Sequence, residues 1–121
     1  WPMCGEIDIM EQTGWEKNVL KGHLHWGHTE TKEYYDEGES KEIPNSSDDF
    51  HIYSLEWTPN EIILLFDNKP FYRVPNDKKR PYDNPHYLLL NLAMGGTLGG
   101  PVSDEFKEAT MEVDYVRISK L

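Results

Sequence analysis

The sequence predicts an all-β fold, an antiparallel β-sandwich or jelly roll, from three observations. Short apolar runs, either alternating or continuous, recur along the chain. Polar, turn-rich segments at 36–49, 75–85 and 95–106 separate them, and no apolar stripe of helical spacing reaches a useful length. Short strands divided by such loops are typical of sandwiches and jelly rolls. The 121 residues suffice for one domain with a modest core.

An acidic strand comes first, in the stretch GEIDIMEQ that begins at Gly5. Glu6 and Asp8 lie two residues apart and share one face of a strand, but strict alternation sends Glu11 into the core. An unpaired carboxylate there would be very costly. One inserted residue, a β-bulge at Ile9–Met10, returns Glu11 to the acidic face.

A three-stranded meander is predicted for residues 51–74. Residues 51–58 alternate, with His51, Tyr53, Leu55 and Trp57 on one face. Pro59-Asn60 then turns the chain into the apolar run 61–66, and the turn signal DNKP leads into FYRV. Trp57 is therefore expected in the core. Two more strands are predicted at 87–94, which is almost continuously apolar, and at 111–118, which alternates.

Three clustered carboxyl groups predict either catalysis or a solvated acidic edge. Two carboxylates about 5–5.5 Å apart form the nucleophile and the acid/base of a retaining glycosidase. A third between them would help to separate the pKa values of its neighbours. The pattern alone leaves two other interpretations open: an acidic strand with no chemistry to perform, and half of a calcium site.

The charge of the chain excludes some partners. The formal net charge is -10, with 22 acidic residues against 12 Lys and Arg. Such a chain repels phosphate backbones and anionic lipids, so no nucleic-acid and no membrane partner is expected. No apolar run approaches the roughly 20 residues of a membrane span. The single Cys4 cannot form an internal disulfide.

The motif WPMCGEIDIME resembles the active-site strand of glycoside hydrolase family 16, in particular its laminarinase (endo-β-1,3-glucanase) type, in which the additional Met makes the bulge. The resemblance continues in HLHWG, in residues 49–74, in PHYLLLNLAMGG and in MEVDYVRI, so it covers essentially the whole chain. It implies a concanavalin A-like jelly roll and a secreted, extracellular enzyme. The implied reaction is retaining hydrolysis of internal β-1,3-glucosidic bonds, with mixed-linkage β-1,3-1,4-glucan as a side substrate.

By the same resemblance, Glu6 is the nucleophile, Glu11 the general acid/base and Asp8 the assisting carboxylate. Asp114 matches an aspartate that often binds a structural calcium, and no cofactor is needed for the chemistry. Sugar rings present apolar C–H faces, so Trp1, Trp15 and Trp26 are candidate binding platforms. His25 could hydrogen-bond a sugar hydroxyl or the acid/base, and Asn91 is a further candidate as the lone amide in an apolar strand. Asn91 could equally satisfy a neighbouring backbone group. His23, His25 and His28 could form a metal cluster, but no carboxylate or Cys is spaced to complete it.

The chain is short for this family and begins on the catalytic strand, so residues 1–121 are expected to form a partial jelly-roll domain lacking its N-terminal half. Half a sandwich leaves a bare apolar face and unpaired edges. We therefore expect a second chain that supplies the missing half, or a second copy of this one, as a partner beside the β-glucan polysaccharide. The main alternative function is a non-catalytic β-glucan-binding protein of the same fold, although all three acids are present. A truncated inactive module, a lichenase, an agarase and a carrageenase are weaker alternatives.

Overall fold

The computed structural model describes residues 1–78 and 80–120. The chain divides into two compact units, residues 1–86 and residues 87–121. Each is described by itself below. The prediction of a single partial domain over 1–121 stays a prediction.

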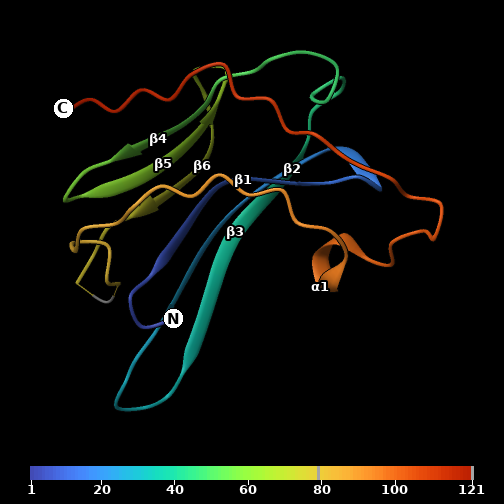
Figure 1. The fold of residues 1–121 in the computed structure, drawn as a ribbon. Coiled ribbons are helices and arrows are strands. Elements are labelled where there is room, and N and C mark those ends of the chain that lie inside the picture. The colour runs from blue at the N-terminus through green and yellow to red at the C-terminus, as the bar shows by residue number, and fades with distance from the viewer. Residues whose placement is uncertain (79, 121) are drawn as a thin grey trace. The chain divides into compact units, whose positions relative to one another are not determined.

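The first unit consists of two three-stranded antiparallel sheets, with strand orders β1-β2-β3 and β4-β5-β6 (Figure 1). This architecture confirms the predicted all-β antiparallel fold. The strands are β1 (Glu6–Thr13), β2 (Glu16–Gly27), β3 (Tyr34–Glu42), β4 (Tyr53–Trp57), β5 (Glu61–Phe66) and β6 (Lys69–Pro75).

The second sheet is the meander expected between residues 51 and 74. Phe66 pairs with Lys69 across a two-residue turn. Asp67 and Asn68 both adopt positive φ, 48° and 62°, as the tight hairpin turns that match strand twist require. The Asp67 carboxylate accepts a hydrogen bond from the Ile52 amide at 3.0 Å, and this contact ties the turn to the start of β4.

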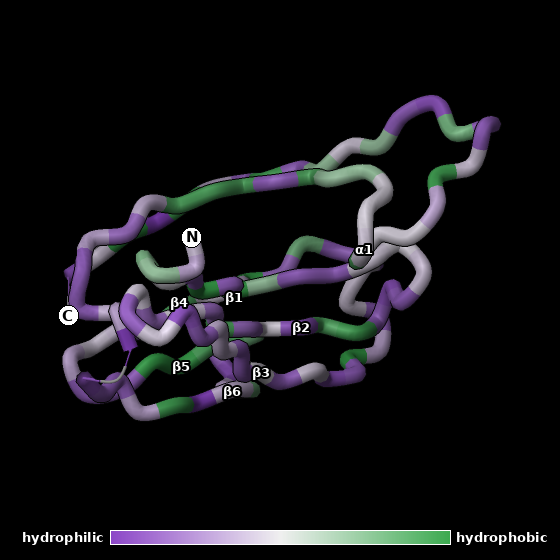
Figure 2. The backbone as a smooth tube through the Cα atoms, turned by 90° about the horizontal axis from the view of Figure 1, so that it is seen from below, coloured by the Kyte–Doolittle hydropathy of each residue, from purple (hydrophilic) through white to green (hydrophobic). Residues whose placement is uncertain are grey.

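The core lies between the two sheets of this unit. Leu24 and Trp26 of β2 form one buried cluster with Ile62 and Leu64 of β5. The sheets approach closely at Gly22, where an added Cβ would lie 2.4 Å from a methyl carbon of Leu64. Figure 2 shows apolar residues along β5 and polar residues along β3. One face of the β1–β3 sheet is therefore used for packing, and the other is free for chemistry.

The predicted β-bulge is present in β1. Asp8 pairs with His23 and Glu11 pairs with Lys21, so three steps along β1 match two steps along β2. The additional residue lies between Asp8 and Glu11, as the parity argument required. The bulge returns Glu11 to the face that carries Asp8.

The second unit differs from the sequence prediction. Residues 87–94 and 111–118 are not strands, and the regular element described there is the short helix α1 (Gly96–Gly99). A strand exists only where a neighbour completes its hydrogen-bonded ladder, and no described residue pairs with these two segments. Their apolar side chains are exposed accordingly, with Leu89 at 71% and Ile118 at 86%. The residue pattern was strand-like, but the pairing that makes a strand is lacking.

Among the described residues, none of the helices has the length and apolar character needed to cross a membrane.

Candidate active site on the acidic face of β1

The three predicted acids lie on one face of the β1–β3 sheet. Residues paired across an antiparallel ladder share a face. Glu6 pairs with His25, Asp8 with His23, and Glu11 with Lys21. Because these β2 residues alternate with the buried Leu20, Gly22, Leu24 and Trp26, all of them face away from the core.

The two histidines contact β1 diagonally rather than straight across the ladder. His25 Nε2 lies 3.2 Å from Asp8 Oδ2, although the ladder partner of His25 is Glu6. His23 Nδ1 lies 3.3 Å from Glu11 Oε2, although its ladder partner is Asp8. Each imidazole therefore contacts the next acid along β1 rather than its ladder partner. The bulge brings Glu11 within reach of His23.

Two aromatic residues complete the end of the site near Glu6. The indole N–H of Trp1 donates a hydrogen bond to the Glu6 carboxylate, while its ring remains 72% exposed. The Tyr34 hydroxyl lies 2.7 Å from His25 Nδ1, and the Trp1 and Tyr34 ring centroids are 5.7 Å apart. Trp1 thus positions a carboxylate and also offers an open aromatic face.

Burial raises the pKa of Asp8 to about 7, and the negative charges of Glu6 and Glu11 add to this effect. His23 opposes it, and a side-chain hydrogen bond to Glu6 favours the protonated form of Asp8 further. A protonated carboxyl group has an O–H to donate. Asp8 therefore carries a proton below about pH 7, and in this form it donates a hydrogen bond to Glu6.

Tyr82 supports this site from the core side. Its ring is fully buried, and its hydroxyl group is shared between two backbone carbonyls, that of His25 at 3.1 Å and that of Glu6 at 3.3 Å. These two residues are ladder partners. Gly5, at φ +78°, allows the approach, because an added Cβ would lie 3.0 Å from the Tyr82 ring.

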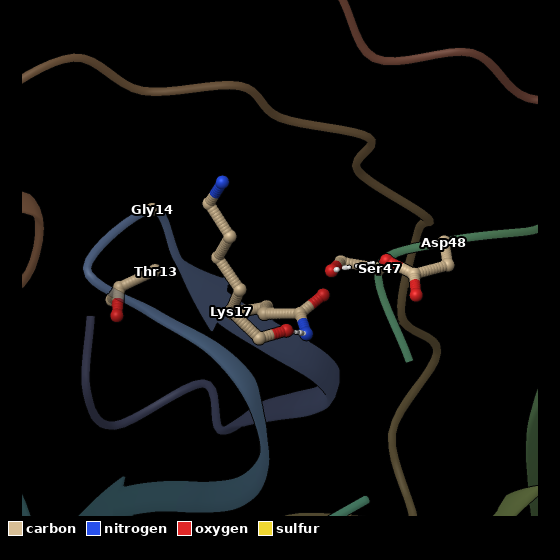
Figure 3. Close-up of a pocket in the computed structure, with 6 residues that line it drawn as sticks. Thr13, Gly14, Lys17, Ser47 and Asp48 are labelled. Atoms are coloured by element: carbon tan, nitrogen blue, oxygen red, sulfur yellow. Dashed lines mark hydrogen bonds between the residues drawn. The ribbon is translucent and has the colours of Figure 1, made fainter. Parts of the chain in front are cut away.

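Trp15 lies at the other end of β1, in the turn to β2, and is 63% exposed. The Lys21 ammonium is 5.4 Å from the centre of its ring and 3.0 Å from Glu16. A polar hollow opens beside this turn (Figure 3), and its lining residues are Gln12, Thr13, Gly14, Lys17, Ser47 and Asp48. Such groups match the hydrogen-bonding demands of sugar hydroxyls, but none of them belongs to the acidic triplet.

Of the predicted sugar-binding residues, the structure brings Trp1 and His25 next to the acids and leaves Trp15 open at the far end. The prediction for Trp26 is corrected. Trp26 is only 8% exposed, stacks on Tyr35 and belongs to the core cluster, because it alternates with His25 along β2. Trp57 is a core-packing residue as predicted: it packs against the same cluster, and its indole N–H donates to the Tyr82 carbonyl at 2.8 Å.

Asn91 and Asp114 lie in the second unit, so their predicted roles stay predictions. In the described part of the chain, no three His, Cys, Asp or Glu residues gather in a way that could hold a metal ion. The structural calcium expected at Asp114 stays a prediction.

The sequence analysis did not identify three residues of this site. Tyr34 and Tyr82 reach it from elements outside the acidic motif, and nothing in their local sequence marks them. His23 was considered only as a metal ligand. Its alternation with His25 on β2 was the signal that could have placed it beside the acids.

The profile of Glycosyl hydrolases family 16 matches residues 2–117. The chain belongs to glycosyl hydrolase family 16. The acidic face of β1 described above is therefore the candidate active site of a family 16 glycosidase.

Proteins similar to this chain include a beta-glucanase from Rhodothermus marinus, 39% identical over 98% of this chain and 45% of the relative. Glucan endo-1,3-beta-glucosidase A1 from Niallia circulans is 34% identical over 99% of this chain and 20% of the relative. The crystal structure of LamAcat from Zobellia galactanivorans has a TM-score of 0.80 at 47% identity, over 88% of this chain and 42% of that chain. A LamA variant from the same organism, in complex with laminaritriose and laminaritetraose, has the same TM-score at 46% identity, over 88% of this chain and 43% of that one. The chain spans less than half the length of each.

Proposed function

We propose that this chain carries the catalytic strand of an endo-acting, retaining β-1,3-glucanase. The observation that supports this most strongly is the bulge between Asp8 and Glu11, which gives Glu6, Asp8 and Glu11 a common face. A plain acidic edge does not need an inserted residue to correct its parity. The contacts of these acids with His25, His23 and Trp1 also suit catalysis more than solvation.

In the proposed reaction, the Glu6 carboxylate attacks the anomeric carbon while Glu11 gives its proton to the departing glycosidic oxygen. The C–O bond to the leaving sugar breaks, and an ester bond to Glu6 forms. Glu11, now a carboxylate, takes a proton from a water molecule whose oxygen attacks the same carbon. The ester breaks, Glu6 is regenerated, and two inversions give net retention.

Asp8 has a different part in this scheme. Its burial and the neighbouring carboxylates raise its pKa to about 7, so it supplies a hydrogen bond to Glu6 rather than another full charge. In the proposed scheme this hydrogen bond orients the Glu6 carboxylate for its attack on the anomeric carbon.

The proposed substrate is a neutral β-1,3-glucan such as laminarin, with mixed-linkage β-1,3-1,4-glucan as a side substrate. The names of the relatives support it, as does the binding of laminari-oligosaccharides by the LamA variant. The exposed rings of Trp1 and Trp15 at the two ends of β1 offer platforms for sugar rings. A net charge of -10 also favours neutral polysaccharides over anionic ones.

We further propose that a second chain, or a second copy of this one, completes the cleft, and that the protein acts outside the cell, where polymeric glucan occurs. β1 is the terminal strand of its sheet in the described part of the chain. An exposed strand edge favours pairing with another strand.

The test measures reducing-sugar release from laminarin and lichenan by the chain alone and mixed with the N-terminal half of a family relative. Glu6→Ala and Glu11→Ala are each expected to abolish hydrolysis while the fold is retained. Azide should rescue Glu6→Ala, with an inverted glycosyl azide as product. Wild-type protein that binds laminarin without releasing sugar would instead support a non-catalytic glucan-binding protein. Unchanged hydrolysis by either variant would contradict the catalytic assignment.

A further inference from the structure

His23 contacts Glu11 in a specific geometry. Nδ1 of the imidazole lies 3.3 Å from Oε2 of the carboxyl group, and both side chains are 29% exposed. Asp8, His25 and Lys21 lie near this pair on the same sheet face, together with Asp36 and Ser40 of β3. The His25 ring is 5.9 Å away from the His23 ring, so it neighbours His23 but does not replace it at Glu11.

Gly38 on β3 makes room for this imidazole. It is the ladder partner of His23, and an added Cβ would lie 2.0 Å from Cδ2 of His23. No real Cβ approaches a neighbour so closely, so any other residue would move the ring or the strand. Space therefore requires glycine here, and the orientation of His23 depends on the absence of a side chain on β3.

We propose that His23 is a positioning residue that directs the acidic proton of Glu11 toward the glycosidic oxygen, an inference that rests on the proposed function. In this role His23 has the Nδ1–H tautomer, so that the imidazole donates to Oε2 both when Glu11 is a neutral acid and when it is a carboxylate. With Oε2 engaged, the proton of the neutral acid resides on Oε1. His23 itself neither bonds to the substrate nor gains or loses a proton in the reaction.

If His23 positions the proton of Glu11, its effect on the rate depends on the leaving group, whereas a purely structural histidine would affect all substrates alike. Protonation of the leaving oxygen matters greatly for a sugar alcohol and little for a dinitrophenolate, which leaves as a stable anion. Loss of His23 should therefore slow glucan cleavage but not the attack of Glu6 on an activated aryl glycoside. The ratio kcat/KM reports that first irreversible step.

The test uses the active form of the protein, alone or with its completing chain, and compares laminarin with 2,4-dinitrophenyl β-laminaribioside. His23→Phe is expected to lower kcat/KM on laminarin about tenfold, mostly through kcat, and to leave the aryl glycoside within about twofold. His23→Asn keeps a donor near the Nδ1 position and should restore most of the laminarin activity. Gly38→Ala should imitate His23→Phe by displacing the ring. His28→Asn is the matched control, because His28 lines a pocket that contains none of the three acids. This substitution should leave kcat/KM unchanged on both substrates.

Thermal unfolding of each variant identifies any that has lost its fold. Should Gly38→Ala unfold, the His23→Phe and His23→Asn pair still decides. Equal losses on both substrates, no loss on either, or failure of His23→Asn to recover would overturn the positioning role. Glu11→Ala separates the two proposals: if it shows no selective loss on laminarin, the assignment of Glu11 as acid/base is wrong, and not the contact with His23 alone.

Discussion

His25 and Trp26 are neighbours in the sequence but lie on opposite faces of β2. His25 lies 3.2 Å from Asp8 on the acidic face, whereas Trp26 is buried in the core between the two sheets. Arg80 covers the Trp26 ring at 5.1 Å and binds Glu37 on β3. Two adjacent residues of β2 therefore have different surroundings: His25 contacts the acids, and Trp26 packs in the core.

This separation predicts different outcomes for two Trp→Ala substitutions. Trp26→Ala should lower the free energy of unfolding by about 3–5 kcal/mol, because it empties a core position. Trp15→Ala should change it by about 0.5 kcal/mol or less, because Trp15 is an exposed turn residue, but it should raise KM for laminarin. Urea denaturation and initial rates measure the two effects. A rise in KM for Trp26→Ala without loss of stability would restore Trp26 as a sugar-binding residue.

Asp8 predicts a pH dependence of stability. In the unfolded chain its carboxyl has its ordinary pKa of 3.8, and in the folded protein burial and neighbouring charges raise the pKa to about 7. The folded state binds this proton more tightly, so the stabilising contribution is present below about pH 4 and is lost as the pH rises through about 7.

The measurement compares the free energy of unfolding of Asp8→Asn and wild type at pH 4, 6 and 8. The variant should gain on the wild type across this range, by less than the roughly 1.4 kcal/mol per pH unit of one full proton, because Asp8 is partly solvent-exposed. A constant difference between the two proteins would mean that Asp8 ionises normally in the folded state.

Tyr82→Phe tests the support beneath the acidic face. The substitution removes only the hydroxyl that the carbonyls of Glu6 and His25 share. The loss of one buried hydrogen bond should cost about 1 kcal/mol of unfolding free energy. Chemical denaturation checks the magnitude. A stability equal to that of the wild type would show that the two carbonyls do not need this donor.

Trp1 contributes a hydrogen bond to Glu6 and an exposed aromatic face, and two substitutions separate these contributions. Trp1→Phe keeps an aromatic face but loses the N–H that Glu6 accepts, so kcat should fall while KM for laminarin changes little. Trp1→Ala loses both contributions, and KM should rise as well. Steady-state kinetics on laminarin resolves the two parameters. Identical kinetics for the two variants would assign the whole effect to the N–H and contradict a contribution of the aromatic face.

The parts of the site that follow from strand periodicity were predictable from the sequence. The off-parity position of Glu11 required an inserted residue, and the register shift in β1 confirms it. The meander followed from alternating runs and a turn signal, and the positive φ of Asp67 and Asn68 is the conformation that such turns adopt. In both cases the decisive interactions are local in sequence.

One failure neglected a local pattern, and the others concern interactions between distant segments. Trp26 was assigned by its chemical type, although the alternation along β2 already placed it opposite His25. Residues 87–94 and 111–118 have strand composition, but the structure describes no strand that pairs with them. The Tyr82 hydroxyl reaches Glu6 from 76 residues away. Such a long-range contact leaves no periodic trace in the sequence.

The tight turn at Asp67-Asn68 also bears on the order of folding. β4, β5 and β6 are consecutive neighbours in their sheet, joined by short turns. Short connections lose little chain entropy on closure and form quickly. The meander should therefore assemble early, as a preformed platform onto which β2 docks its Leu24 face. Strand β1 would then acquire its final geometry late, when Tyr82 closes beneath it.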